Sequence, residues 1–111
     1  MTTTFRGTDD TGHRADPLDP ESLRALLAQG GSELVVEEVA DAGADPAPTT
    51  GATVRARRTE GERWTVEVRP AEGPVLRSGT PNTDATFDLV RSWCADDGWW
   101  LEAFSWESVE I

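Results

Sequence analysis

The chain has 111 residues, enough for one domain and too few for a deep cleft between two lobes. It carries 21 acidic residues against 10 basic ones, all of them arginine, for a net charge of −11. This charge argues against nucleic acid and anionic lipid as partners and favours basic ones.

The cysteine count and the hydropathy further restrict the kinds of protein that this chain can be. The single cysteine, Cys94, excludes an internal disulfide and argues against a metal site. Hydrophobic residues make up 37% of the chain, and five tryptophans and three phenylalanines supply much of the apolar surface for a core. No apolar stretch reaches the length of a signal peptide or a membrane span, so we expect a cytoplasmic protein.

The first elements follow from composition and helix-capping signals. Residues 1–16 are polar apart from Phe5 and are expected to form a flexible tail ahead of a single domain over residues 17–111. Asp19 and Pro20 are typical of an N-cap and a first helical position, so a helix should begin there and end near residue 29. Its leucines recur at helical spacing on one face.

Strand signals follow this helix. Residues 33–39 are rich in β-branched side chains and predict the first strand, and residues 40–50 predict a loop. Residues 52–58 and 62–69 alternate apolar and polar side chains, which predicts a β-hairpin with left-handed Gly61 closing a three-residue loop. The predicted cross-strand pairs are Val54 with Val66, Ala56 with Trp64, and Arg58 with Glu62.

The C-terminal half predicts one more helix and one more long strand. A connection over residues 70–82 contains a candidate short strand at 75–78, and residues 83–95 have the apolar spacing of a buried helix. Residues 101–111 alternate as a strand with a bulge near 107 and 108. The expected fold is therefore a two-layer α+β domain in the order α-β-β-β-α-β, with a mostly antiparallel sheet of about four strands and two helices.

Groups able to carry catalysis are few. His13, the one histidine, falls in the expected tail, and Cys94 lies on an apolar helix face, where cysteine usually serves as a small hydrophobic residue. Glu37 and Glu38 are strand neighbours and point to opposite faces, which makes them a poor acid–base pair. We expect no catalytic residue, no metal and no cofactor.

Arginines concentrate on the predicted hairpin. They form either a phosphate or acidic-peptide site or, more simply, an exposed sheet face whose arginines pair with Glu62 and Glu67. The four residues are Arg55, Arg57, Arg58 and Arg63.

The segment from Trp93 to Ile111 carries the strongest functional signal, because it combines four tryptophans with five acidic residues and has no basic one. Trp93 and Trp106 suit core positions. Aromatic anchors within an acidic rim are what a site for a basic protein needs. The alternative is that one tryptophan caps the core while the acidic side chains stay solvated. The predicted partner-binding residues are Asp96, Asp97, Trp99, Trp100, Glu102 and Glu107.

Several segments resemble known proteins. The run Leu34-Val35-Val36-Glu37-Glu38, the helix ending Arg91-Ser92-Trp93 and the strand Phe104-Ser105-Trp106-Glu107 look like small uncharacterised actinobacterial proteins. The helix followed by a terminal Trp-Glu strand is also similar to one class of immunity proteins of bacterial polymorphic toxin systems. That resemblance implies an α+β antitoxin that occludes a basic toxin or enzyme surface.

Two other classes of function are left open. An accessory or scaffold protein, phage-borne or homodimeric, could pair with a partner through an exposed edge of the strand at residues 33–39. A small-molecule-binding domain could line a pocket with Trp99 and Trp100.

Overall fold

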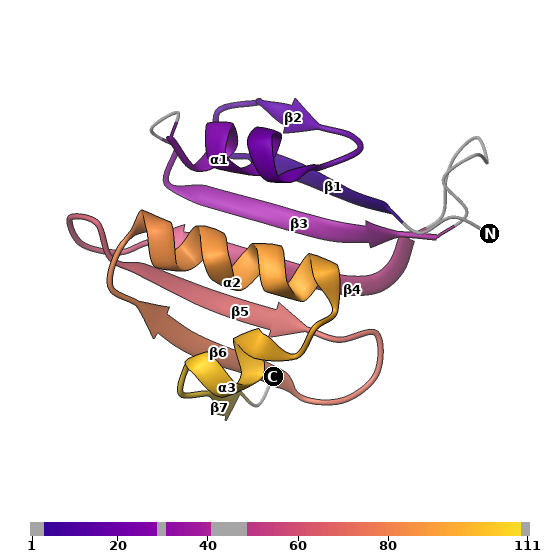
Figure 1. Cartoon of the computed structure of the whole chain (residues 1–111), viewed down its shortest axis with the longest axis vertical. Coiled ribbons are helices and arrows are strands. Elements are labelled where there is room, and N and C mark those ends of the chain that lie inside the picture. The colour runs from indigo at the N-terminus through magenta and orange to yellow at the C-terminus, as the bar shows by residue number, and fades with distance from the viewer. Residues whose placement is uncertain (1–3, 29–30, 41–48, 110–111) are drawn as a thin grey trace.

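The computed structural model describes residues 4–28, 31–40 and 49–109. Within these residues there are seven strands and three helices. The strands are β1 (Thr4–Asp9), β2 (Arg14–Ala15), β3 (Glu33–Val39), β4 (Thr49–Arg58), β5 (Trp64–Arg69), β6 (Val75–Thr80) and β7 (Glu107–Val109), and the helices are α1 (Pro20–Ala28), α2 (Thr83–Ala95) and α3 (Trp99–Ala103). One antiparallel sheet in the order β2-β1-β3-β4-β5-β6-β7 carries the helices on one side (Figure 1).

This architecture shows that the predicted fold, about four strands and two helices in the order α-β-β-β-α-β, is wrong. The expected N-terminal tail contains β1 and β2, and the expected C-terminal strand is divided into α3 and β7. The polar composition of the tail predicts that the entropy cost of ordering keeps this segment flexible. Every residue of β1 pairs with β3, however, and these long-range backbone hydrogen bonds offset that cost. Residues 1–3 of that tail lie outside the described residues.

Elements defined by local signals lie close to their expected bounds. β3 and α2 span the predicted residues, and α1 begins at Pro20. The Asp19 carboxylate accepts a hydrogen bond from the Ser22 backbone N–H at 2.7 Å, as an N-cap should. Most of the predicted loop at residues 40–50 lies outside the described residues.

The hairpin of β4 and β5 occurs, but its predicted register is wrong by two residues. Val54 pairs with Val68, Ala56 with Val66 and Arg58 with Trp64. A shift of two residues leaves every side chain on the same face, so hydrophobic alternation cannot distinguish the two registers. Gly61 is left-handed, with φ of 58°, as predicted.

The core lies between the sheet and the helices. α1 contributes three buried leucines, α2 contributes Phe87, Leu89 and Val90, and the central strands contribute valines and Trp64. α1 lies so close to β1 that a Cβ atom on Gly7 would come within 2.9 Å of the Leu26 Cδ1 atom. A side chain at position 7 would therefore require the Leu26 and Leu18 side chains to shift.

A buried carboxylate organises the turn after β1. Asp9 is 6% exposed and accepts hydrogen bonds from the Thr11 N–H (2.9 Å), the Thr11 hydroxyl (2.8 Å) and the His13 N–H (2.9 Å). The His13 Nδ1 atom lies 3.1 Å from the same carboxylate, so this residue, expected to be solvated in a tail, takes part in the turn. Burial opposes ionisation, but these hydrogen bonds outweigh it and lower the pKa of Asp9.

Replacing Asp9 by asparagine is expected to destabilise the protein in a pH-dependent way. The folded-state pKa lies below the ordinary value of 3.8, so the stabilising effect of the ionised group is present above that pH and is lost as pH falls through the folded pKa. Urea unfolding should show D9N less stable than wild type at a pH well above 3.8, with the difference in stability narrowing as the pH falls below 3.8. D16N, which changes an exposed carboxylate nearby, should differ from wild type by less than about 0.5 kcal/mol. A D9N gap that persists at the lower pH would contradict the linkage.

Candidate functional site

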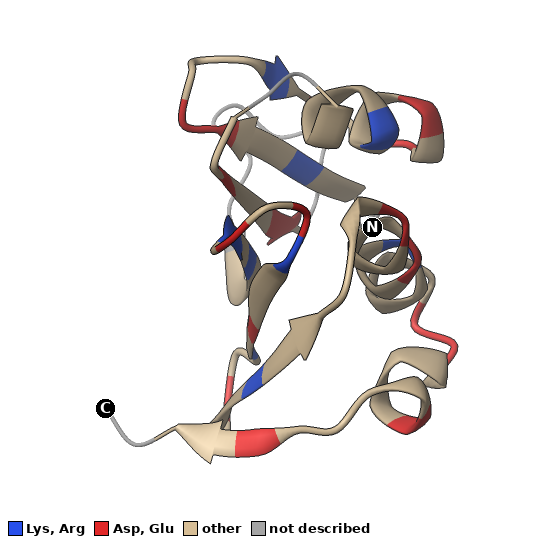
Figure 2. Ribbon diagram, turned by 90° about the vertical axis from the view of Figure 1, so that its left-hand side faces the viewer, with Lys and Arg blue, Asp and Glu red and all other residues tan. Residues whose placement is uncertain are grey.

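The chain makes a sharp turn between α2 and α3. Asp96 and Gly98 are both left-handed, with φ of 55° and 78°, and α3 begins directly after them. Figure 2 shows α3 at a corner of the molecule, with acidic residues in the turn and on the helix itself. The turn therefore places Trp99 and Trp100 on a helix separate from α2.

Asp97 holds α3 in place. Its carboxylate accepts hydrogen bonds from the Ser92 hydroxyl and from the Trp99 backbone N–H, the latter at 3.0 Å. The Ser92 oxygen in turn accepts from the Trp100 N–H at 3.1 Å. The two hydrogen bonds to the carboxylate, above all the one from Ser92, lower the pKa of Asp97. The group therefore stays ionised and acts as the N-terminal cap that Gly98 cannot supply.

Trp100 anchors α3 on the core. Its ring meets Trp106 edge to face, with centroids 5.3 Å apart, and its carbonyl accepts a hydrogen bond from the Trp106 Nε1 atom at 2.9 Å. Both rings are partly buried and pack against the main hydrophobic cluster. Trp100 is therefore a structural residue of the corner.

The side chains around the rest of α3 face solvent. Trp99 is 46% exposed and Leu101 is 50% exposed. Among the described residues, these are the two large hydrophobic residues that are exposed to solvent. Successive helical residues are about 100° apart, so with Trp100 on the core, Trp99 and Leu101 occupy the two flanks and Glu102 points outward. We call Asp96, Trp99, Leu101 and Glu102 the α3 corner.

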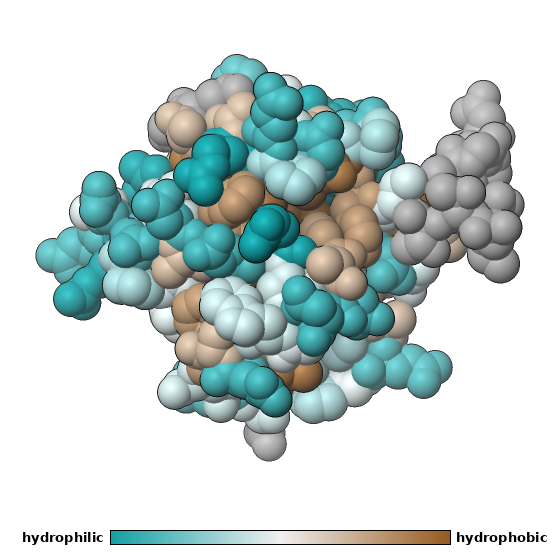
Figure 3. All heavy atoms as spheres, viewed as in Figure 1, coloured by the Kyte–Doolittle hydropathy of each residue, from teal (hydrophilic) through white to brown (hydrophobic). Residues whose placement is uncertain are grey.

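Trp99 also forms one end of a groove on the helical side. A hollow of about 650 Å³ lies between the start of α1, α2 and α3, and it shares Pro20, Arg91 and Ala95 with a second, mostly apolar hollow of about 270 Å³. We call the two hollows together the helix groove. Figure 3 shows hydrophobic surface gathered between α1 and α2, where this groove runs. Its other lining residues are Phe5, Leu18, Asp19, Leu23, Asp88, Ser92, Cys94 and Asp97.

The structure brings together most, but not all, of the residues predicted to bind a partner. Asp96, Asp97, Trp99 and Glu102 lie in or beside α3, whereas Trp100 faces the core. Glu107 lies on β7 opposite Arg77, on the sheet face away from the helices. It therefore lies on a different face of the molecule from the α3 corner.

Sequence reasoning missed Leu101 and the helix groove. The alternation of residues 101–111 predicts a strand, in which Leu101 would alternate with buried residues. The Asp97-Gly98-Trp99 pattern, an acceptor side chain two residues before a helical N–H, is a local signal that could have indicated a short helix there. The groove depends on how α1 meets α2 and has no such local signal.

The fold and site together define a two-layer α+β domain with a hydrophobic groove and an acidic, aromatic corner on its helical side. No protein-family model, curated protein or solved structure matches the chain. Within the described residues, no helix has both the length and the apolar character needed to cross a membrane. In the same part of the chain, no three His, Cys, Asp or Glu side chains gather as metal ligands would.

The Cys94 thiol, which lines the groove, is expected to react slowly. Burial first, and the negative charge of Glu38 second, raise its pKa to about 12, so the neutral thiol predominates at ordinary pH. Alkylation by iodoacetamide at about pH 8 should be at least about a hundredfold slower than for a cysteine peptide, and it should still accelerate above pH 10. E38Q should increase the rate, whereas E37Q, on the opposite sheet face, should not. A peptide-like rate for the wild-type protein would refute this description of the groove.

Proposed function

We propose that the chain is a cytoplasmic protein-binding domain, an immunity-type inhibitor without catalytic activity that occludes the basic surface of a toxin or enzyme. The observation that carries the proposal is the α3 corner: two exposed hydrophobic side chains flanked by carboxylates, in a segment with no basic residue after Arg91. The hydrophobic side chains would supply contact area freed from water, and the carboxylates would supply charge complementarity. The resemblance to immunity proteins favours the same class.

The helix groove supports a partner with an amphipathic segment. Its apolar part can accept a hydrophobic side chain, and Trp99 borders it at the α3 end. Three carboxylates, Asp19, Asp88 and Asp97, lie along it against the single Arg91, which leaves an excess of two negative charges. A partner helix or loop with basic residues around an apolar one fits this arrangement.

The alternative functions have less support. The edge proposed for sheet pairing is absent, because β3 is hydrogen-bonded to β1 on one side and β4 on the other. In the described residues the outer strands are β2 and β7, of two and three residues, and such short edges discourage pairing. A small-molecule pocket shared by Trp99 and Trp100 is also disfavoured, since Trp100 packs on Trp106 and Trp99 borders the helix groove.

Capture from the cells of origin at graded salt tests the proposal. The tagged chain should retain a basic protein at about 50 mM NaCl and lose it progressively towards about 500 mM, because screening weakens the attraction. The double variant D96R/E102R should retain much less of it. E60R/E62R makes the same change in net charge in the exposed β4–β5 turn and should behave as wild type. Salt-independent capture, or equal losses from both double variants, would refute a specific role for the α3 corner.

A further inference from the structure

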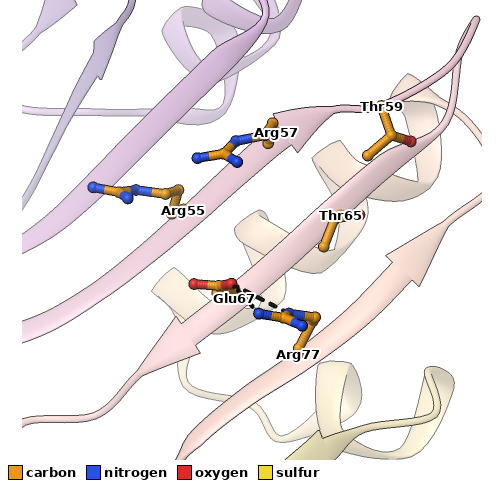
Figure 4. A pocket seen from close by; sticks show the side chains of 6 residues that line it. All are labelled: Arg55, Arg57, Thr59, Thr65, Glu67 and Arg77. Carbon is orange, nitrogen blue, oxygen red and sulfur yellow. Dashed lines mark hydrogen bonds and ion pairs between the residues drawn. The ribbon is translucent and has the colours of Figure 1, made fainter. Parts of the chain in front are cut away.

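We propose that the helix-free face of the sheet holds a binding site for a phosphate-like anion, formed by Arg55, Arg57 and Arg77. This site is independent of the α3 corner, which lies on the helical side. Figure 4 shows the three arginines with Thr59, Thr65 and Glu67 around one hollow of about 270 Å³.

The charge on this face differs from that of the whole molecule. Strand register places six arginines and four glutamates on it, an excess of two positive charges in a chain whose net charge is −11. The residues are Arg6, Arg14, Arg55, Arg57, Arg69 and Arg77, with Glu33, Glu37, Glu67 and Glu107. An anion that the rest of the surface repels can therefore be accepted here.

Cross-strand rows create the hollow. Arg55, Glu67 and Arg77 are neighbours across β4, β5 and β6, and the adjacent row consists of Arg57, Thr65 and Gly79. The short Thr65 side chain leaves space beside the long guanidinium side chains. A Cβ atom on Gly79 would meet nothing closer than the Trp64 carbonyl oxygen at 3.9 Å, an ordinary contact. Packing therefore tolerates a side chain at position 79, which borders a second hollow beside Trp106 and Glu107.

Hydrogen-bonding capacity is left over in the hollow. Its one carboxylate, Glu67, is already engaged, since its Oε1 atom accepts from the Arg77 Nε (3.2 Å) and Nη2 (2.9 Å) atoms. Arg55 and Arg57 make only long contacts with the two oxygens of Glu33, at 3.4 and 3.5 Å, and their side chains are 52% and 62% exposed. Charge-assisted hydrogen bonds are typically about 2.7–2.9 Å long, so a bound anion can offer these two guanidinium groups better partners.

The arrangement of donors indicates a tetrahedral oxyanion. Three arginines face Glu67 in the lining and Glu33 beside it, which leaves one positive charge, and the Thr65 hydroxyl can donate as well. Guanidinium groups match the geometry of phosphate oxygens, and several of them can share one tetrahedral anion. A phosphate monoester or inorganic phosphate matches these donors.

Titration at constant ionic strength tests the site, with amide and arginine Nε–H NMR signals as the readout. Inorganic phosphate and O-phosphoserine should shift the signals of Arg55, Arg57, Arg77 and Thr65, and only phosphoserine should do so if an ester group is required. R57Q should weaken binding about tenfold, and E67Q should strengthen it about tenfold by removing the competing carboxylate. R14Q, which removes an exposed arginine on β2, should have no effect.

Three outcomes would overturn the proposal. Equal shifts with sodium chloride would show general ion screening, and binding of a polyglutamate peptide without binding of phosphate would show a protein-docking face instead. Loss of binding in R14Q as well as R57Q would show dependence on net charge alone. Unchanged signals elsewhere in the spectrum would establish that the variants remain folded.

Discussion

Replacing Trp64 by alanine is expected to lower the free energy of unfolding by about 3–5 kcal/mol, a large share of the stability of a domain this size. The side chain is 2% exposed and packs between the sheet and α2. Its Nε1 atom donates a hydrogen bond to the Thr83 hydroxyl at 3.1 Å, which fixes the start of α2, and the Arg58 guanidinium lies 4.9 Å from its ring centroid. The loss thus combines a cavity, a hydrogen bond and a cation–π contact.

Urea unfolding followed by circular dichroism measures this effect without depending on tryptophan fluorescence. W64F retains most of the apolar volume and should lose less, about 1–2 kcal/mol, chiefly the hydrogen bond and part of the packing. W99A removes a half-exposed tryptophan and should cost less than about 1 kcal/mol. Comparable losses in W64A and W99A would contradict the assignment of Trp64 to the core and Trp99 to the surface.

The second large effect concerns binding. W99A is expected to weaken affinity for the basic partner by about 2 kcal/mol, or about thirtyfold, because a tryptophan at the centre of a contact surface commonly carries this much binding energy. Isothermal titration calorimetry with the captured partner measures it. W99F preserves much of the aromatic area and should retain most of the affinity. Wild-type affinity in W99A, with stability unchanged, would show that the partner binds elsewhere.

Local signals in the sequence predicted the elements that depend on nearby residues. Asp19 and Pro20 mark the start of α1, and the β-branched run predicts β3, because capping and strand propensity act within a few residues. The faces of the β4–β5 hairpin followed from alternation alone. Its register did not, because a shift by two residues changes the pairs without moving any side chain to the other face.

The two ends of the chain depended on partners far away in sequence. β1 is polar, but it is ordered by pairing with β3, and the Asp10 carboxylate secures the contact by accepting hydrogen bonds from Ser32 and Glu33. At the other end, the aromatic alternation suggested one strand. The tie between Ser92 and Asp97 forms α3 instead.

The sequence by itself determined that this protein is acidic and that its charges are unevenly distributed, with arginines on a hairpin and an aromatic, acidic C-terminal segment. Composition and the position of charges along the chain are properties of the sequence alone. Only the tertiary structure decided which of those residues act together. Folding placed Trp99 and Glu102 on an exposed corner, turned Trp100 inward, and brought Glu107 to the sheet face of Arg77. The physical reason is that surface sites are built from side chains brought together by long-range strand pairing and helix packing, which no local pattern specifies.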